Sequence, residues 1–286
     1  MTFRGQVAFV TGAGRGIGRA IASAFGRAGA DLALLARSKS DLNQVAQELS
    51  REGINCLHLS ADVSNHHAVT RAVRAVLSRF GRIDILVSAA GVYGPIGPLV
   101  DNPMDDWVRA LEINLFGTVY CLRAVLPHML ARGSGVVIHL SGGGAVSPFP
   151  RFSAYGTSKA AVARLTETVA EEVRAHGVRI NAIAPGAINT GLLDQVLAAG
   201  EAAGVEFYAK SLEQKRNGGT SPELAAELAL FLASPAAAGI TGRLISAVWD
   251  DWKSLSAHAQ ELNHSALYTL RRIDGRNFAE VRPTSA

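Results

Sequence analysis

The chain has 286 residues, a length that fits one large α/β domain or two small ones. Hydrophobic residues make up 48% of the chain and charged residues 18%, a balance that favours a folded protein with a sizeable core and argues against disorder. The formal net charge is +4 and only 6% of the residues are aromatic. A nucleic-acid-binding face needs clustered Lys and Arg with aromatic partners, so we expect no nucleic-acid partner.

The cysteines and histidines do not suggest a metal centre or a disulfide framework. Cys56 and Cys121 lie far apart, and the eight histidines lack the paired spacing of metal ligands. The first residues, MTFRGQVAFVTGAG, have no signal-peptide architecture. No uncharged apolar stretch of about 18 residues occurs. We therefore expect no metal, no membrane segment and a cytoplasmic location.

Short apolar runs alternate with amphipathic segments along the chain. Strands are predicted at 6–12, 31–37, 56–63, 83–91, 135–142, 178–186 and 242–248. Helices are predicted at 19–29, 40–53, 66–81, 104–130, 154–177 and 222–234. Continuously apolar strands are typical of sheets buried on both faces, and strand–helix alternation implies right-handed crossovers between parallel strands. The pattern predicts an α/β fold with a doubly wound parallel sheet and helices on both faces.

The domain organisation follows from where this alternation is interrupted. A single doubly wound nucleotide-binding domain is predicted for residues 1–250, with a polar, Ala- and Gly-rich insertion at 187–221. Insertions of this length often cover active sites. Residues 251–286 form a polar C-terminal extension, whose aromatic residues indicate partial docking onto the domain.

The first predicted strand runs into a glycine-rich turn, TGAGRGIG at 11–18, which opens a helix. Gly12, Gly16 and Gly18 allow the backbone to bend sharply and to approach a pyrophosphate, which would sit on the helix N-terminus with Ile17 among its contacts. Placed between a strand and a helix, this turn predicts a dinucleotide site.

The end of the second strand indicates which dinucleotide is bound. An NAD site places an acidic residue there to bind the ribose diol, whereas this chain has Arg37 after Leu-Leu-Ala. Arg15 lies in the glycine turn, and two guanidinium groups near the adenosine ribose would pair with a 2′-phosphate. This favours NADP(H) over NAD(H), mainly on Arg37. The alternative is that both arginines are solvated loop residues.

Several further motifs occur in a fixed order: DV at 62–63, AAG at 89–91, Asn114 in INLFG, YGTSK at 155–159 and INAIAPG at 180–186. Together with the glycine turn and Thr190, they make residues 5–245 resemble the short-chain dehydrogenase/reductase family. The resemblance implies a Rossmann-type sheet of seven strands in the order 3-2-1-4-5-6-7. It also implies a homodimer or homotetramer joined through the helices at 104–130 and 154–177.

The same resemblance implies roles for residues along the cofactor. Asp62 and Val63 would flank the adenine, and Ala90 and Gly91 would lie along its ribose. The nicotinamide end would be held by Pro185, Gly186, Ile188 and Thr190.

The chemistry can be argued from Tyr155 and Lys159 directly. Hydride transfer to a carbonyl carbon creates an alkoxide that needs a proton, and a phenol can supply it if its pKa falls towards neutrality. Tyr155 and Lys159 are four residues apart on a predicted helix and share one face, so the ammonium should lower the phenol pKa. Lys159 would also bond the nicotinamide ribose, and Asn114 would keep a water relay to it. The alternative is an ordinary surface Tyr and Lys.

The main departure from the family pattern lies in LSGGG at 140–144. The family usually has a serine thirteen residues before the tyrosine, and here that position is Gly142, with Ser141 one residue earlier. Ser141 could serve if the glycines distort the strand end. Alternatively, a substrate hydroxyl, a water or a backbone N–H replaces the serine, and the glycines make room for a bulky or polyhydroxylated substrate. The third possibility is that oxidoreduction is lost or altered.

The sequence therefore predicts an NADP(H)-dependent enzyme that interconverts a secondary alcohol and a ketone. Its partner is a small carbonyl or alcohol substrate, with Tyr155, Lys159, Asn114 and Ser141 as catalytic candidates. Two alternatives remain open: an epimerase or dehydratase that uses the cofactor transiently, and a binding protein that senses NADP(H) with altered catalysis.

Overall fold

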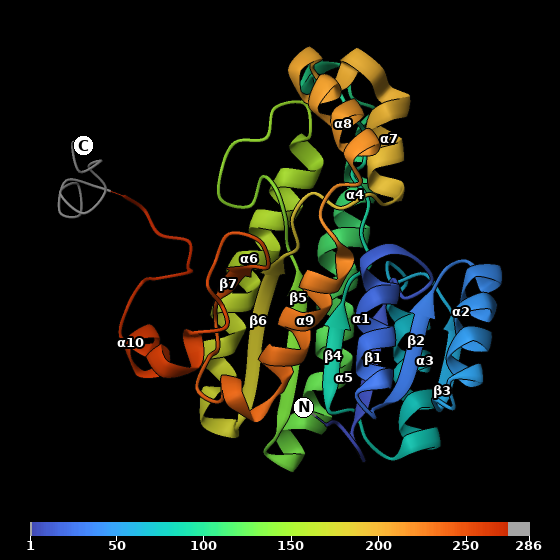
Figure 1. The fold of residues 1–286 in the computed structure, drawn as a ribbon, viewed down its shortest axis with the longest axis vertical. Coiled ribbons are helices and arrows are strands. Elements are labelled where there is room, and N and C mark those ends of the chain that lie inside the picture. Colours follow the sequence, from blue (N-terminus) through green and yellow to red (C-terminus); the bar gives the residue numbers. More distant parts are fainter. Residues whose placement is uncertain (1, 274–286) are drawn as a thin grey trace.

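The structure of the chain, a computed structural model, describes residues 2–273 (Figure 1). Its centre is a seven-stranded sheet in the order β3-β2-β1-β4-β5-β6-β7, in which every neighbouring pair is parallel. The predicted fold class and strand order are confirmed. The strands are β1 Val7–Thr11, β2 Asp31–Ala36, β3 Cys56–Ser60, β4 Ile85–Ser88, β5 Gly135–Leu140, β6 Val178–Ala184 and β7 Leu244–Ser246.

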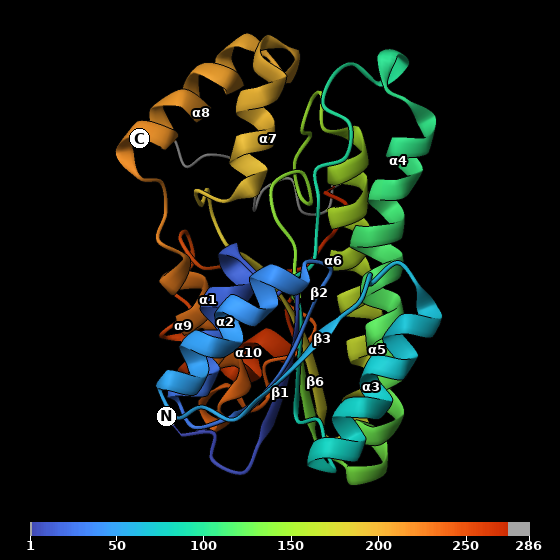
Figure 2. The ribbon, with the colours of Figure 1, turned by 90° about the vertical axis from the view of Figure 1, so that its right-hand side faces the viewer.

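Helices cover both faces of the sheet (Figure 2). In chain order they are α1 Gly16–Arg27, α2 Lys39–Arg51, α3 His66–Phe80, α4 Met104–Leu111, α5 Gly117–Arg132, α6 Ser153–Val173, α7 Gly191–Ala199, α8 Val205–Asn217, α9 Pro222–Ala233 and α10 Ala259–Asn263. Short 3₁₀ turns lie at Leu99–Asp101, Arg174–His176, Gly200–Ala203, Pro235–Ala237 and Leu255–His258. One face packs against α1, α2 and α9, and the other against α3, α5 and α6.

The strands are apolar throughout because successive side chains enter two different cores. In β1, Ala8 and Val10 pack with α1 and α9, whereas Val7 and Phe9 pack with α3 and α5. All five residues of this strand are buried. Side chains alternate across a strand, so a strand covered on both faces needs apolar residues at every position.

The long helix predicted at 104–130 is continuous but not uniform. A π-helical turn, Glu112–Phe116, joins α4 to α5, and Asn114 lies within it. Single π turns inside an α-helix frequently occur at functional sites. By length and composition, Met104–Arg132 is the one helix of the described chain that would suffice to cross a membrane. Core helices of soluble proteins meet the same criterion, and this helix packs against α3 and α6.

The predicted insertion at 187–221 contains two helices. α7 and α8 are joined by the 3₁₀ turn Gly200–Ala203 and pack on each other. They stand beyond the carboxyl ends of the strands, at the top of Figure 1. In open α/β sheets ligands bind at this end of the strands, so α7 and α8 lie where a cover over a site would be expected.

The described part of the C-terminal extension, residues 251–273, is docked on the domain. Trp252, Leu255 and Leu262 are buried in the core that contains α1 and α9. The backbone N–H of Leu244 in β7 donates to the carbonyl of Tyr268 at 2.8 Å, so the extension lies along the outer edge of the sheet. Residues 274–286 of the predicted extension lie outside the described residues.

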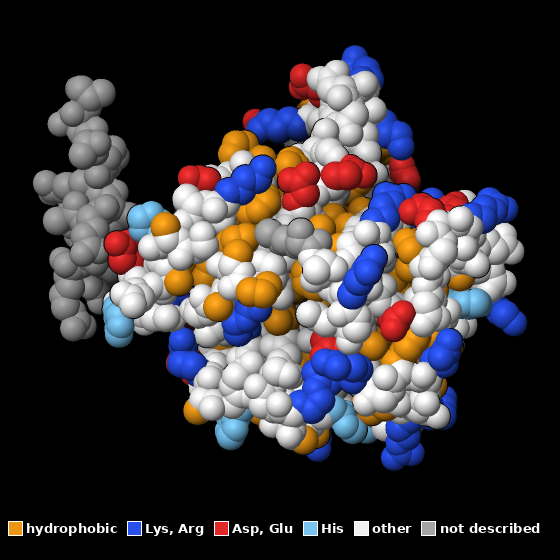
Figure 3. Space-filling view, turned by 60° about the horizontal axis from the view of Figure 1, so that its bottom comes forward, with side chains coloured by type: hydrophobic (Ala, Val, Ile, Leu, Met, Phe, Trp, Pro, Cys, Tyr) orange, Lys and Arg blue, Asp and Glu red, His pale blue; other side chains and the backbone are white. Residues whose placement is uncertain are grey.

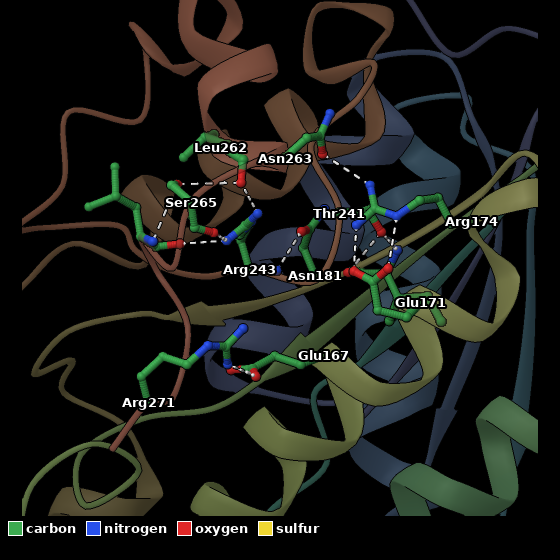
Figure 4. Close-up of polar contacts among 12 residues, drawn as sticks. Glu167, Glu171, Arg174, Asn181, Thr241, Arg243, Leu262, Asn263, Ser265 and Arg271 are labelled. Carbon is green, nitrogen blue, oxygen red and sulfur yellow. Dashed lines mark hydrogen bonds and ion pairs between the residues drawn. The ribbon is translucent and has the colours of Figure 1, made fainter. Parts of the chain in front are cut away.

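Buried charges anchor this extension (Figure 4). Arg243 donates to the backbone carbonyls of Leu262, Ser265 and Leu267. Glu167 on α6 accepts from Arg271 at 2.9 Å and from a backbone N–H of the extension at 2.6 Å. Elsewhere the charges are more dispersed: on the face in Figure 3, Lys and Arg are interspersed with Asp, Glu and hydrophobic side chains.

Candidate active site

The glycine-rich turn between β1 and α1 is closed so tightly that two of its positions have no room for a side chain. Gly12 has a positive φ of 66°, and a Cβ there would lie 2.7 Å from the backbone nitrogen of Ala90. A Cβ on Gly18 would collide with the carbonyl oxygen of Gly12. The first turn of α1 contains no acidic residue, and the first N–H groups of a helix have no partners within it. The turn therefore offers free donors to an anion.

A cavity of about 520 Å³ opens in front of this turn. It extends from the ends of β1, β2 and β4 to the start of α7. Eleven of the predicted cofactor residues line it: Gly12, Arg15, Gly16, Ile17, Gly18, Arg37, Asp62, Val63, Ala90, Gly91 and Thr190. Five others do not: Tyr155, Lys159, Pro185, Gly186 and Ile188.

The sequence reasoning missed several lining residues. Gly14 lies inside the glycine motif and Ser38 directly follows Arg37, so their positions in the sequence could have identified both as lining residues. Leu192 and Gln195 of α7 carried none, because no motif marks the insertion. Asp41 also lines the cavity, where it places a carboxylate near the end of β2.

The two predicted phosphate-binding arginines lie apart. Arg37 follows β2, is exposed and lies close enough to Asp62 for its charge to help lower the pKa of that carboxyl. The Arg15 guanidinium instead lies beside Gly191, 3.3 Å from where a Cβ on that glycine would be. Because Gly191 begins α7, the Arg15 side chain extends towards the insertion, and Arg37 is the arginine positioned at the β2 end.

Asp62 belongs to a polar network that the sequence did not reveal. Its carboxylate accepts from Arg109 of α4 at 2.5 Å and from the Ser64 hydroxyl at 2.7 Å, and Arg109 also pairs with Glu112. Partial burial raises the pKa of Asp62, but the Ser64 hydrogen bonds and the charges of Arg109 and Arg37 outweigh it, so the pKa is lowered. This network connects the cavity wall at Asp62 to the helix that leads into the π-helical turn with Asn114.

Tyr155 and Lys159 lie one turn apart on α6 and both are buried. Lys159 Nζ donates to the carbonyl of Leu140 at 2.8 Å and lies 5.5 Å from the centre of the Tyr155 ring. A Cβ on Gly91, which lines the cavity, would lie 3.5 Å from Lys159 Nζ. The pair therefore meets the cavity at Gly91, although neither residue lines the cavity itself.

Asn114 is held at the junction of three segments. Its amide exchanges hydrogen bonds with the backbone of Val92, each at 2.8 Å, and donates to the Ser158 hydroxyl at 2.9 Å. Ser158 in turn donates to the carbonyl of Tyr155. Asn114 thereby connects the loop after β4 to α6, the helix that carries Tyr155 and Lys159. Val92 of that loop lines the cavity.

Burial sets the acid–base properties of this pair, and one expectation was wrong. The sequence reasoning had Lys159 lower the pKa of Tyr155, but burial, with a contribution from Tyr93, raises the pKa of the Tyr155 phenol. Burial also lowers the pKa of Lys159 to about 8. At neutral pH the phenol therefore holds its proton, and the ammonium is close to its own titration range.

At the position where the family has a serine, the tyrosine hydroxyl lies too close to leave room for a side chain. A Cβ on Gly142 would lie 2.6 Å from Tyr155 Oη. The hydroxyl of Ser141 is buried and bonds to the backbone carbonyl of Lys159 at 3.2 Å. Ser141 thus links β5 to α6, as expected for a strand neighbour that faces the other way.

The predicted nicotinamide-end residues surround the start of the insertion. Thr190 caps α7 by accepting from the N–H of Leu192, and its methyl group would lie 3.2 Å from a Cβ on Gly16. Gly186 has a φ of 90°, and a Cβ there would clash with Val248. Ile188 forms bridges with Gly219 and Thr220, which close the insertion at its base. Thr190 is the member of this group that faces the glycine turn.

His139 and Cys121 belong to the core. His139 is fully buried and its Nδ1 lies 3.0 Å from Thr166 Oγ1, and burial with the Lys159 charge lowers its pKa to about 3. Within residues 2–273, no three His, Cys, Asp or Glu side chains are grouped as a metal site would require. Cys121 is buried, which raises the pKa of its thiol to about 12.

These residues fit a nicotinamide dinucleotide. The glycine cradle has no room for side chains, the helix N-terminus beside it offers free donors, and the cavity extends from Arg37 to the vicinity of Lys159. Strand order and the position of the cavity at the strand ends are those of a Rossmann-type fold. Fold and site together define a dinucleotide-dependent oxidoreductase.

Comparison with known proteins gives the family. The family model described as short chain dehydrogenase matches residues 6–200. The 7α-hydroxysteroid dehydrogenase of Escherichia coli K12 is 33% identical over 245 residues, which cover 85% of this chain and 92% of that protein. The chain belongs to the short-chain dehydrogenase/reductase family. It is an NAD(P)-dependent dehydrogenase/reductase of that family.

Two solved structures show how closely the fold matches. The crystal structure of NAD⁺-bound xylitol dehydrogenase has a TM-score of 0.81 and 30% identity, over 86% of this chain and 98% of that one. A gluconate 5-dehydrogenase from Burkholderia cenocepacia J2315, in complex with NADP and tartrate, has a TM-score of 0.77 and 29% identity, over 86% of this chain and 94% of that one. Relatives therefore bind either dinucleotide.

Proposed function

We propose that the protein is an NADP(H)-dependent oxidoreductase that interconverts a secondary alcohol and a ketone. The main supporting observation is that Lys159 Nζ lies next to Gly91, which lines the cavity. The buried Tyr155–Lys159 pair on α6 therefore lies at one end of a cavity large enough for a dinucleotide. A surface Tyr and Lys would be neither buried nor tied to the cavity wall by Asn114.

The bound nicotinamide would supply the hydride for reduction of the ketone, or accept it in the reverse reaction. Tyr155 acts as the general acid: its Oη–H bond breaks as the alkoxide oxygen takes the proton, and the phenolate remains. The Lys159 ammonium, which donates to the Leu140 carbonyl and lies 5.5 Å from the centre of the Tyr155 ring, stabilises that phenolate. The Tyr155 phenol holds its proton at neutral pH, so it can act as the acid in the reductive direction. Because burial raises its pKa, this proton transfer depends on the Lys159 ammonium stabilising the phenolate.

Arg37 supports the preference for NADP(H). It lies at the end of β2, lines the cavity and is exposed to a ligand there. A guanidinium at this position can form a charge-assisted pair with a 2′-phosphate, and a ribose diol offers no such charge. Asp41 on the same wall would oppose a phosphate, so the preference depends on the arginine outweighing it.

We further propose a homodimer or homotetramer joined through α4–α5 and α6. Val108 of α4 and Phe116 of the π-helical turn between α4 and α5 are large apolar side chains left exposed, at 42% and 44%. Light scattering of the purified chain would test it, and a monomer at micromolar concentration would contradict it.

NADPH oxidation over a panel of ketones tests the function. We expect turnover that a Tyr155→Phe variant loses and a Tyr268→Phe variant keeps, because Tyr268 lies in the C-terminal extension and packs against the core that contains α1 and α9. Full activity in Tyr155→Phe would contradict the proposal. Tight NADP(H) binding without turnover of any ketone would favour a sensing protein, and product formation without net NADPH loss an epimerase or dehydratase.

A further inference from the structure

A third hydrophobic cluster lies apart from the two cores of the sheet. It contains five aromatic side chains: Tyr93, Phe149, Phe152, Tyr155 and Phe207. We refer to these five residues as the aromatic cluster. They come from the loops after β4 and β5, from the start of α6 and from α8, which are the segments at the strand ends. The other four members therefore lie around Tyr155 at the strand ends, apart from the two cores that pack on the sheet.

The rings of the aromatic cluster form a wall on one side of Tyr155. The Tyr93 ring stands edge-on to Tyr155 with the ring centres 4.7 Å apart. Phe149 and Phe152 are stacked, with centres 4.3 Å apart and planes 9° apart. Phe207 meets both of these rings edge-on at 5.2 Å. Offset-stacked and edge-to-face geometries are those in which aromatic rings attract one another most strongly.

The glycine run after β5 brings Phe149 into this wall. Gly144 has a φ of 84°, and a Cβ there would lie 3.0 Å from Phe149 Cβ and 2.9 Å from the Cα of Gly156. The loop can fold back onto α6 only because these positions lack side chains. The glycines thus allow Phe149 to lie near Tyr155. Side chains at these positions would push the loop, and Phe149 with it, away from α6.

The insertion closes the aromatic cluster from the opposite side. Phe207 of α8 reaches the stacked rings, and Val196 of α7 and Ala203 are buried with them. Arg151, which has a positive φ of 69°, donates to the carbonyl of Ala202 at 3.3 Å. The insertion therefore contacts the loop after β5 through apolar rings and the hydrogen bond of Arg151. A ligand ring that replaced some of these contacts would leave no buried charge without a partner.

We propose that the substrate is an aryl or fused-ring ketone whose ring packs against the partly exposed faces of Phe149, Phe207 and Tyr93, with its carbonyl directed to Tyr155. The proposal rests on the proposed function and names its substrate class. The members of the cluster carry no charged groups, and apart from Tyr155 the only polar group among them is the Tyr93 phenol, whose pKa burial raises. A polyhydroxylated sugar would bury hydroxyls here without partners, at a cost of about 1–3 kcal/mol for each group left unsatisfied.

The occupant can be tested by binding, independently of turnover. The Tyr155→Phe variant, saturated with the cofactor it binds, is titrated calorimetrically with 1-tetralone, a fused-ring ketone, and with D-fructose, a polyhydroxylated ketone. We expect tetralone to bind more tightly. Adding Phe207→Ala or Phe149→Ala should weaken tetralone binding about tenfold, because each removes a ring contact and its buried area. Phe207→Tyr should retain most of the affinity.

Leu212→Ala is the matched control, because Leu212 is on the same helix and 38% exposed. Unchanged cofactor affinity shows that each variant remains folded. Fructose binding as tightly as tetralone, no tetralone binding, or tetralone affinity unchanged by both Phe→Ala variants would each overturn the substrate class. Tyr155-dependent turnover of fructose would still leave the proposed function standing. Conversely, Phe207-dependent tetralone binding with no turnover by the unmodified chain would support the aromatic site and contradict the ketoreductase.

Discussion

Tyr155 Oη lies 2.6 Å from the position that a Cβ on Gly142 would take. The Tyr155 hydroxyl therefore lies in space that a side chain at residue 142 would need. A Gly142→Ala variant must displace either the strand end or the phenol. We expect a loss of about 1–3 kcal/mol in the free energy of unfolding, as for other overpacked sites, and a fall in kcat of about a hundredfold from the misplaced hydroxyl.

Gly143→Ala provides the control for this prediction. A Cβ on Gly143 would meet only Phe149, at an ordinary contact distance of 3.9 Å. Urea unfolding and NADPH oxidation of both variants should separate the two neighbouring glycines. Equal behaviour of the two variants would mean that Tyr155 does not need the space beside Gly142, and a rise in kcat for Gly142→Ser would mean that a serine can be accommodated there.

Replacing Arg37 tests the cofactor preference. We expect Arg37→Ala to weaken NADPH binding by about tenfold, which corresponds to losing one charge-assisted pair of roughly 1.4 kcal/mol, and to leave NADH binding nearly unchanged. Lys39→Ala is the control, because Lys39 is an exposed cation two residues further along that does not line the cavity. Fluorescence titration with both dinucleotides measures the effect. Tighter binding of NADH than NADPH by the unmodified chain would show the preference to be wrong.

The sequence was sufficient for the sheet because each strand is a continuously apolar run between polar turns. Strand positions were right to within a few residues, but their ends were overestimated: the strand predicted at 83–91 is β4 Ile85–Ser88. Residues 89–91 continue the apolar run, yet Ala89 and Ala90 donate their N–H groups to Thr11 Oγ1 and turn towards the cavity. Composition alone cannot distinguish the last residues of a buried strand from an apolar loop that lines a cavity.

The site was only partly predictable, because several contacts join segments without a local signal. Glycine spacing located the cradle, and helical spacing placed Tyr155 beside Lys159. The clash between residue 142 and the phenol could not be foreseen, since it depends on how β5 meets α6. The expected lowering of the Tyr155 pKa failed for a related reason: sequence spacing shows that a cation is near but not how far both groups are removed from water.

Lys159 should make stability depend on pH. Its pKa is lowered from 10.5 to about 8 because the folded state buries the ammonium, so below pH 8 both states are charged and the folded state bears the full burial penalty. Between pH 8 and 10.5 the folded state releases the proton while the unfolded state keeps it. Stability relative to a Lys159→Met variant should therefore rise by about 1.4 kcal/mol per pH unit in this window.

Urea unfolding of both proteins at pH 7, 8, 9 and 10 measures this difference. The comparison with Lys159→Met removes contributions that the two chains share, including those of other titrating groups. A difference that stays constant over the whole range would contradict the lowered Lys159 pKa. A difference that falls with rising pH would mean that the folded state holds the ammonium more strongly than water does.

Arg243 should be essential for docking of the C-terminal extension. Its side chain is 5% exposed and donates to three backbone carbonyls between Leu262 and Leu267. Arg243→Met keeps much of the apolar stem but leaves these carbonyls without their donor, so we expect a loss of about 2–4 kcal/mol in the free energy of unfolding and faster proteolysis of residues 252–270. Arg71→Met is the control, because Arg71 is exposed on α3. Equal proteolysis of the two variants would show that the Arg243 hydrogen bonds are not needed for docking, and that the buried side chains of Trp252, Leu255 and Leu262 and the contacts of Glu167 are sufficient.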